Sequence, residues 1–322
     1  MKKEPNLTAE ERVYYSLKSL YENFGYKQYK MRKFEEYSLY SENKNFLKSD
    51  SVITFNDRNG KLLALKPDVT LSIVKNTKAA LRNNEKLYYK ESVYRLDKGR
   101  NEFKEISQIG LEFLGDVDRY SVLEILTLAA ETLNAVDARF VLDISHMGII
   151  SGILQEYGID SCPEKVSECI KSKNLHDMPS VCAECGLSEE ISVKLAELLG
   201  ASGNCRSVLK IARDTVCGSA AVSAVDELEE LCSAFEKTAY ADKLNIDFSI
   251  VNDMAYYNGI VFQGYIDRFS KAVLSGGRYD NLVKKFRSDI SALGFALYLD
   301  EFGYYGNVNS EYDADVLLLY SD

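Results

Sequence analysis

The sequence has little proline and no tryptophan: its 322 residues include 4 prolines and 2 histidines. Proline-rich linkers are therefore excluded, and no apolar run approaches the roughly 20 residues that a membrane-spanning helix needs. Residues 1–5 are charged and lack the apolar stretch of a signal peptide. Hydrophobic residues make up 46% and charged residues 27%, which is typical of a globular protein and excludes a disordered one. We expect a soluble cytoplasmic protein.

Positive charge is also in deficit, because 39 Lys and Arg stand against 49 Asp and Glu, for a net charge of −10. An acidic chain repels polyphosphate, so nucleic acid is disfavoured as a partner. We therefore expect neither nucleic acid nor a membrane among the partners.

Cysteine is confined to one part of the chain, between residues 162 and 232. Cys182 and Cys185 form a single C-x-x-C pair, and a zinc site would need two further ligands from Cys162, Cys169 or His176. The alternative is a set of ordinary reduced thiols in a helical segment, and the lack of a second paired motif favours it, so we expect no metal. The seven cysteines are Cys162, Cys169, Cys182, Cys185, Cys205, Cys217 and Cys232.

Short local signals divide the chain into helices and hairpins. Thr8 and Glu11 form a capping box at the start of a helix. Asn and Gly residues between two apolar runs predict a hairpin over 51–65, and Pro67 delays the next helix to about Thr70. Further strands are predicted at 87–94, 106–114 and 139–144, a charged loop at 96–105 and a helix at 123–133.

The sequence pattern changes at about residue 150, and the segment that follows contains several helix patterns and all seven cysteines. We interpret residues 151–240 as a helical insertion. Strands return at 246–251, 260–266 and 271–274, and residues 292–302 are typical of a buried strand that runs into a helix. Strands joined as hairpins, with flanking helices, indicate an antiparallel α+β core.

One strand places polar residues in an alternating pattern. In Gln108-Ile109-Gly110-Leu111-Glu112-Phe113, the residues Gln108, Gly110 and Glu112 share one face. The glycine allows a ligand to approach the backbone, and two polar side chains roughly 13 Å apart could hold opposite sides of a small polar molecule. The alternative is the solvent-facing side of an antiparallel sheet, which composition alone favours.

Two further segments combine glycine with tyrosine. Tyr256-Tyr257-Asn258-Gly259 precedes a predicted strand, and Ser275-Gly276-Gly277-Arg278-Tyr279-Asp280 follows one. Taken alone, each has an ordinary turn as its alternative interpretation. The glycine spacing fits neither a P-loop nor a dinucleotide fingerprint.

The order of these segments resembles the catalytic core of class II histidyl-tRNA synthetases. More closely, it resembles the synthetase-like regulatory subunits of short-form ATP phosphoribosyltransferase. The resemblance covers about residues 8–150 and 241–305. Its strongest segments are Phe55-Asn56-Asp57-Arg58, Leu65-Lys66-Pro67-Asp68-Val69-Thr70, Tyr94-Arg95 through Gln108-Ile109-Gly110-Leu111-Glu112, Tyr256-Tyr257-Asn258-Gly259-Ile260-Val261-Phe262 and Ser275-Gly276-Gly277-Arg278-Tyr279-Asp280.

The resemblance implies a class II aminoacyl-tRNA synthetase-like fold, with an antiparallel sheet of six or seven strands flanked by helices. It divides the chain into a first part of the core at 1–150, the helical insertion at 151–240 and a second part at 241–308. Residues 309–322 would be a short remnant of the anticodon-binding domain, most of which we expect to be missing.

The resemblance also implies a histidine pocket. Its members would be Asp68, Thr70, Gln108, Glu112, Tyr256, Tyr257 and Tyr279. Such carboxylates can accept charge-assisted hydrogen bonds from the ammonium and imidazole groups of free histidine. Arg100 is a further possible ligand contact, although the loop that carries it is one residue shorter than in the synthetases.

Two positions depart from the synthetase pattern. Asn252 stands where the synthetases have an arginine at the histidine carboxylate and the ATP α-phosphate, and Glu301 stands where they have an arginine at the γ-phosphate. The aspartate that precedes the tyrosine pair in the synthetases is Ala255 here. We therefore expect no catalytic residue and no cofactor.

The resemblance thus predicts a non-catalytic regulatory subunit, needed for the first step of histidine biosynthesis and for its feedback inhibition by histidine. Its partners would be the short catalytic subunit, L-histidine and a second copy of itself, as a homodimer within a hetero-oligomer. The alternatives are an active histidyl-tRNA synthetase and another histidine-sensing synthetase paralogue.

Overall fold

The computed structural model describes residues 7–44, 47, 51–79, 83–97, 99–159, 164–250, 256–287 and 289–300. Within these ranges, no helix is both long and apolar enough to span a bilayer.

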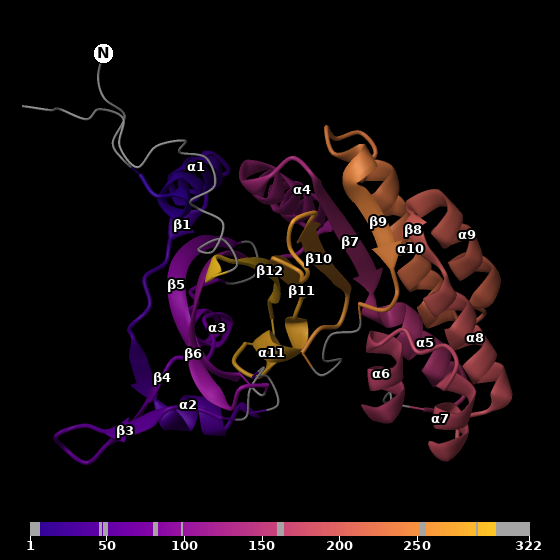
Figure 1. The fold of residues 1–322 in the computed structure, drawn as a ribbon, viewed down its shortest axis with the longest axis horizontal. Coiled ribbons are helices and arrows are strands. Elements are labelled where there is room, and N and C mark those ends of the chain that lie inside the picture. The colour runs from indigo at the N-terminus through magenta and orange to yellow at the C-terminus, as the bar shows by residue number, and fades with distance from the viewer. Residues whose placement is uncertain are drawn as a thin grey trace, which may run out of the picture.

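A nine-stranded sheet forms the centre of the fold (Figure 1). Neighbouring strands are antiparallel except at two places near the edges, where β1 pairs with β5 and β7 with β9 in parallel. The predicted antiparallel core is therefore confirmed, and the two parallel pairs extend it. In order across the sheet the strands are β1 (Lys27–Gln28), β5 (Glu85–Asp97), β6 (Glu102–Gly115), β12 (Ser291–Tyr298), β11 (Leu274–Arg278), β10 (Ile260–Ile266), β7 (Phe140–His146), β9 (Leu244–Asp247) and β8 (Ser202–Asn204).

A small second sheet contains the hairpin predicted over 51–65. Strand β3 (Thr54–Asn56) pairs antiparallel with β4 (Leu62–Leu65), which also pairs with β2 (Phe34–Glu36). Asp57 caps the turn, because its Oδ1 accepts hydrogen bonds from the backbone N–H groups of Asn59 and Lys61, at 2.8 Å each. This local bonding explains why the hairpin could be predicted from its turn residues.

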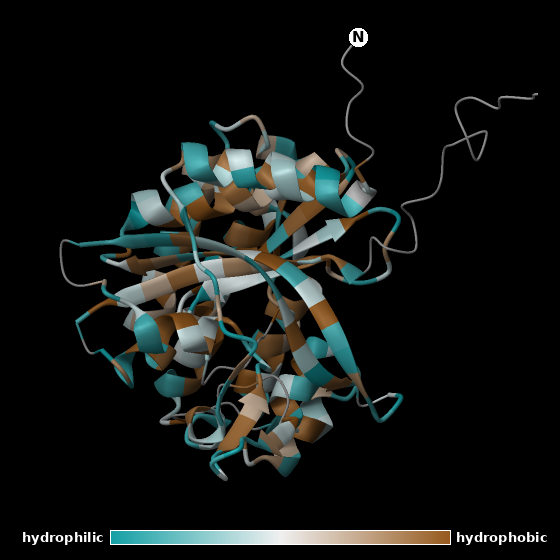
Figure 2. Ribbon diagram, turned by 90° about the vertical axis from the view of Figure 1, so that its left-hand side faces the viewer, coloured by the Kyte–Doolittle hydropathy of each residue, from teal (hydrophilic) through white to brown (hydrophobic). Residues whose placement is uncertain are grey.

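Helices cover both faces of the large sheet, above and below it in Figure 2. Alternate residues of β6 enter two different apolar cores, since Leu111 packs into one and Leu114 into the other. The helices that line the first core are α1 (Ala9–Asn23), α4 (Arg119–Val136), α9 (Cys205–Thr215) and α10 (Ser219–Phe235). Those that line the second are α2 (Tyr37–Ser41), α3 (Thr70–Asn76), α6 (Glu164–Lys171), α7 (Met178–Glu184) and α11 (Asp280–Lys284). Helices α5 (Met147–Glu156) and α8 (Glu189–Gly200) contribute to both.

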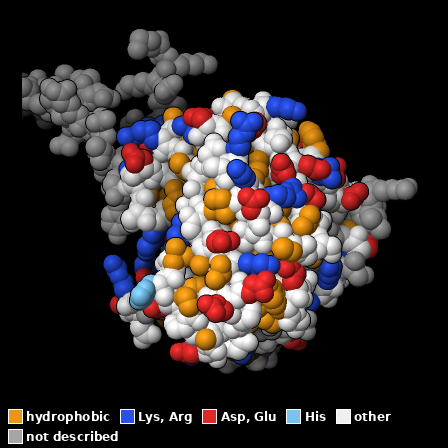
Figure 3. All heavy atoms as spheres, turned by 90° about the vertical axis from the view of Figure 1, so that its right-hand side faces the viewer, with side chains coloured by type: hydrophobic (Ala, Val, Ile, Leu, Met, Phe, Trp, Pro, Cys, Tyr) orange, Lys and Arg blue, Asp and Glu red, His pale blue; other side chains and the backbone are white. Residues whose placement is uncertain are grey.

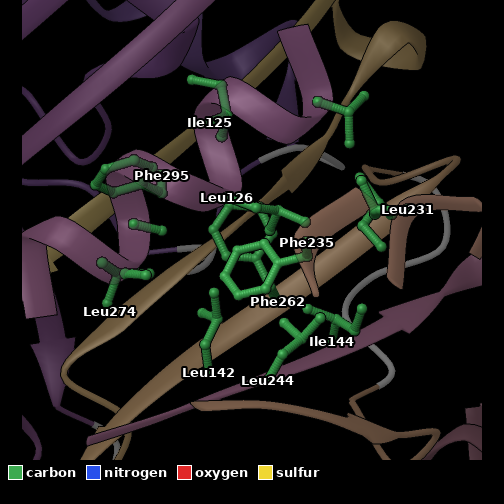
Figure 4. Packing of buried hydrophobic residues seen from close by; sticks show 14 of the residues in the cluster. Ile125, Leu126, Leu142, Ile144, Leu231, Phe235, Leu244, Phe262, Leu274 and Phe295 are labelled. Carbon is green, nitrogen blue, oxygen red and sulfur yellow. The ribbon is translucent and has the colours of Figure 1, made fainter. Parts of the chain in front are cut away.

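The first core is centred on aromatic rings from two central strands (Figure 4). Phe262 of β10 and Phe295 of β12 meet edge to face, with ring centroids 6.3 Å apart. Leu126 of α4 and Phe235 of α10 complete the packing around Phe262, and all of these side chains are buried. Burying aromatic groups of this size dominates core stability.

Several local predictions were wrong. Strand β9 ends at Asp247, short of the predicted 246–251, and β11 starts at Leu274, where the predicted strand 271–274 ends. The predicted strands at 87–94 and 106–114 do form a hairpin, but most of the predicted loop at 96–105 belongs to its strands, because β5 continues to Asp97 and β6 starts at Glu102. Its charges pair across the strands, as the 2.6 Å ion pair of Lys104 with Asp97 does. The Ser275-Gly276-Gly277-Arg278 segment lies in strand β11. Glycine is needed there because a Cβ at Gly276 would lie 2.5 Å from both the Phe262 ring and the Gly294 carbonyl.

The segment predicted as a helical insertion contains helices α6 to α10, together with strand β8 at the sheet edge. Helices α9 and α10 share the first core with α4 and the central strands. The division at residues 150 and 240 stays a prediction, as does the remnant at 309–322, which lies outside the described residues.

Candidate ligand-binding site

Strand β6 brings Gln108 and Glu112 to one wall of a polar pocket, as the alternating pattern predicts. Both side chains are buried, at 3% and 2% exposure, so the solvent-facing alternative is wrong. Gly110 lies between them under the ring of Tyr89, and a Cβ at this glycine would lie 2.3 Å from that ring. The absence of a side chain at Gly110 therefore allows the Tyr89 ring to pack directly against the backbone of β6.

Glu112 is the polar centre of the pocket. The Thr70 hydroxyl donates to its Oε1 at 2.6 Å, and the Tyr279 hydroxyl donates to its Oε2. The pKa of Glu112 is raised to about 8, mainly by burial and in smaller part by the nearby charge of Asp68, although the hydrogen bonds from Thr70 and Tyr279 lower it. At neutral pH most molecules therefore hold Glu112 protonated, and a cation beside it would favour the carboxylate.

Asp68 is held at the start of α3. Its Oδ1 accepts from the Leu71 N–H at 2.9 Å, and its Oδ2 lies 3.4 Å from an Nη of Arg95. The Arg95 Nε donates to the Pro67 carbonyl at 2.8 Å, which fixes the guanidinium against the loop. Asp68 is thus a second buried carboxylate in the pocket, and the Arg95 guanidinium balances its charge.

Tyrosines close the pocket. The rings of Tyr256 and Tyr257 lie 4.6 Å apart, and Tyr256 lies 5.7 Å from the Tyr279 ring. Burial raises the pKa of each of these phenols above its ordinary value, so all three are neutral donors or acceptors. The seven residues predicted for the histidine pocket therefore all line one cavity: Asp68, Thr70, Gln108, Glu112, Tyr256, Tyr257 and Tyr279.

The cavity between these side chains is narrow, with a volume of about 30 Å³. That is room for roughly one water molecule, whereas pockets for small molecules usually measure about 300–1,000 Å³. A ligand as large as an amino acid therefore fits only if some of the lining side chains move outward.

Sequence reasoning missed several lining residues. Arg95 and Tyr89 of β5 face the cavity. The alternation along this strand could have shown that these two residues share a face, because residues an even number apart on a strand point to the same side. Tyr298 and Ser275 also line it. Arg100, predicted as a possible ligand contact, lies instead in the exposed turn between β5 and β6 and is not among the lining residues.

A larger groove of about 970 Å³ lies elsewhere, between α4 and α10. Charged side chains line it, and they pair with one another, as Arg119 does with Glu230 at 2.5 Å. None of its lining residues was predicted as a site. The small polar pocket is the better candidate, because the carboxyl groups of Asp68 and Glu112 are buried there and the pKa of Glu112 is raised.

Comparison with known proteins settles the family. A family model described as histidyl-tRNA synthetase matches residues 3–302. The chain is 30% identical over 254 residues to the ATP phosphoribosyltransferase regulatory subunit of Carboxydothermus hydrogenoformans, covering 77% of this chain and 78% of that one. The chain belongs to the ATP phosphoribosyltransferase regulatory subunits of the histidyl-tRNA synthetase family.

Other members of the family are also similar. The histidine–tRNA ligase of Methanocaldococcus jannaschii is 28% identical over 290 residues, covering 88% of this chain and 68% of that one. A solved structure described as a regulatory subunit or histidyl-tRNA synthetase from Bacillus halodurans has a TM-score of 0.82 at 24% identity, covering 95% of this chain and 84% of that one. One chain of an ATP phosphoribosyltransferase complex from Thermotoga maritima has a TM-score of 0.70 at 19% identity, with coverages of 92% and 98%. These two likenesses establish the shared class II synthetase-like fold.

The family positions that depart from the synthetase pattern, Asn252 and Glu301, lie outside the described residues, as does Ala255. Their identities in the sequence still bear on function. The described part of the pocket offers two buried carboxylates, an arginine and several hydroxyl groups, which suit a small zwitterion.

Proposed function

We propose that the protein is a non-catalytic regulatory subunit of short-form ATP phosphoribosyltransferase that binds free L-histidine in the pocket around Glu112. Its membership of the regulatory-subunit family supports the role in histidine biosynthesis. It would act in the cytoplasm, as a homodimer within a hetero-oligomer with the catalytic subunit.

The observation that carries the proposal is a contrast between two sets of positions. All seven residues predicted to hold histidine line one buried cavity. At the two positions where the synthetases hold ATP with arginines, this sequence has Asn252 and Glu301. An arginine that stabilises phosphoryl charge is worth about 10³–10⁵ in rate in related chemistry, and a carboxylate would repel the same phosphate. The combination favours histidine binding without adenylate formation.

Histidine would enter by displacing the tyrosine rings. Its ammonium or imidazolium would pair with Glu112, whose carboxylate form it stabilises, while Asp68 with Arg95 and the hydroxyl of Thr70 would supply the remaining polar contacts. Because the pocket is narrow without such movement, histidine would favour the open arrangement over the closed one. If the catalytic subunit also binds the open and closed arrangements with different affinity, histidine binding would change how tightly that subunit binds.

Reconstitution tests the proposal. The full chain is mixed with the short catalytic subunit from the same source, and phosphoribosyl-ATP formation is followed with and without histidine, with each protein alone as control. Activity that requires the mixture and falls with histidine supports the proposal. A catalytic subunit that is equally active alone, or a mixture that ignores histidine, contradicts it.

The pocket is tested in the same assay by a matched pair of variants on strand β6. Glu112→Gln removes the buried carboxylate, and Glu102→Gln changes an exposed residue of the same strand. Relative to each variant's own uninhibited rate, Glu112→Gln should raise the half-inhibitory histidine concentration at least about tenfold, the effect of losing a charged hydrogen bond. Equal histidine sensitivity in both variants would place the histidine site elsewhere.

The second candidate is an active histidyl-tRNA synthetase, which the 28% identity to the Methanocaldococcus ligase favours. It predicts histidine-dependent exchange of pyrophosphate into ATP by this chain alone. We expect no exchange above background, because Asn252 and Glu301 replace the two arginines.

A further inference from the structure

Two cysteines from different helices meet beside the sheet edge. Cys205 is the first residue of α9, and Cys232 lies in the last turn of α10. Both side chains are buried, at 7% and 2% exposure, both residues line one cavity, and each thiol shifts the pKa of the other, while the Cys205 thiol also donates to the Leu244 carbonyl at 3.8 Å. The two sulfurs are therefore neighbours although the residues are far apart in the sequence.

Both thiols line a cavity of about 340 Å³ between the two helices. The cavity is large enough to admit a small hydroperoxide, since one water molecule needs about 30 Å³. Its rim carries Arg206 and Lys210 from α9 and Glu236 from beyond α10. On the face of the molecule seen in Figure 3, acidic and basic side chains are interspersed.

The two thiols are chemically unequal. The hydrogen bond from the Cys232 thiol lowers the pKa of Cys205 and raises the pKa of Cys232. Cys205 also begins a helix, where the backbone N–H groups favour a thiolate. Cys205 is thus the better nucleophile, and Cys232 is the thiol held beside it.

We propose that Cys205 and Cys232 form a redox-active dithiol, a modification site at which a hydroperoxide closes a reversible disulfide between α9 and α10. The thiolate of Cys205 attacks a peroxide oxygen, the O–O bond breaks, and hydroxide or alkoxide leaves and takes a proton from solvent water. Cys205 is then a sulfenic acid, oxidised by two electrons. The Cys232 sulfur attacks the Cys205 sulfur, the S–O bond breaks, and the hydroxide takes the Cys232 proton and leaves as water.

Cys169 and Cys182 lack the lowered pKa of Cys205, although Cys182 also has other cysteines nearby. Burial raises the pKa of Cys169 and of Cys182, and the Cys182 thiol contacts the Met178 sulfur at 3.6 Å. Cys217 is exposed, with the Lys194 ammonium 3.8 Å from its sulfur. Cys217 is therefore accessible, but no cysteine partner is described for it.

The test measures disulfide formation in the full chain under sub-millimolar hydrogen peroxide. Trypsin places Cys205 in peptide 195–206, but peptide 214–237 contains both Cys217 and Cys232. The experiment therefore uses a Cys217→Ser background, in which a link between the two peptides identifies the pair without ambiguity. We expect that link to form in the folded chain and to disappear with dithiothreitol. Formation should be at least about tenfold faster than in urea, where the arrangement of the two thiols is lost.

Variants assign the two roles. Cys232→Ser should leave a sulfenic acid on Cys205 that dimedone traps, whereas Cys205→Ser should leave Cys232 unmodified by peroxide. Failure to form the link in the folded chain would overturn the proposal, as would equal rates in buffer and in urea. The comparison of buffer with urea does not depend on whether the Cys205→Ser and Cys232→Ser variants fold. Dimedone labelling of Cys232 in the Cys205→Ser chain would overturn the assigned order of attack.

Discussion

Replacing Glu112 with glutamine should remove the part of the pH dependence of folding stability between pH 4.5 and pH 8 that Glu112 contributes. Burial raises the pKa of Glu112 in the folded chain from 4.5 to about 8. Over this range the unfolded chain loses the proton while the folded chain keeps it, so the folded state binds more protons. The contribution of Glu112 to stability is therefore fully present below pH 4.5 and is lost progressively as the pH rises to 8.

The size of the effect follows from the shift. A rise in pKa from 4.5 to about 8 corresponds to about 5 kcal/mol, at 1.36 kcal/mol for each pKa unit. Glutamine keeps the shape of the protonated acid and one carbonyl oxygen for Thr70 or Tyr279 to donate to. The variant should therefore match the wild-type chain near pH 4.5 and exceed its stability by a few kcal/mol at pH 8 and above.

Urea unfolding at intervals from pH 4.5 to pH 9 measures this difference. Glu102→Gln, the exposed change on the same strand, is the control and should follow the wild-type curve. Parallel curves for the wild-type chain and Glu112→Gln over the whole range would refute the reasoning, because Glu112 would then titrate alike in both states.

Three further changes test other parts of the structure. Gly110→Ala should destabilise the fold by about 1–3 kcal/mol through the clash with Tyr89, and an unchanged urea midpoint would contradict that. Tyr279→Phe removes a donor that favours the Glu112 carboxylate, so the fall in stability with pH should extend to higher pH; an unchanged profile would show that the bond is absent. His146→Ala removes the acceptor for the Gly148 N–H at the start of α5 and should cost about 0.5–2 kcal/mol, so an unchanged thermal midpoint would argue against the cap.

Local patterns predicted the elements that local physics determines. The alternation in 108–113 predicted which residues share a face, because a strand turns its side chains to opposite sides at every residue. The start of α3 at Thr70 follows from Pro67, and the 51–65 hairpin follows from its turn. The resemblance then predicted the seven pocket residues together, which no single motif could do.

The remaining features depend on contacts between distant segments. The local sequence does not show whether Gly276 and Gly277 form a turn or lie in a central strand. They lie in a strand, and the rings of Phe262 and Tyr257 occupy the space that side chains at these two positions would need. Tyr89 joins the pocket because β5 pairs with β6 in a register that sets it opposite Gly110. Whether the 108–112 face meets solvent depends on the tyrosines that cover it, and these come from residues 256–279.

The central claim is that the pocket around Glu112 takes histidine. Isothermal calorimetry of L-histidine into the full chain at pH 7, with wild type, Glu112→Gln and Glu102→Gln compared, tests it most directly. The account predicts saturable binding by the wild type and Glu102→Gln, and affinity at least about tenfold weaker in Glu112→Gln. Binding of equal affinity in all three chains, or no binding by the folded wild type, would contradict it.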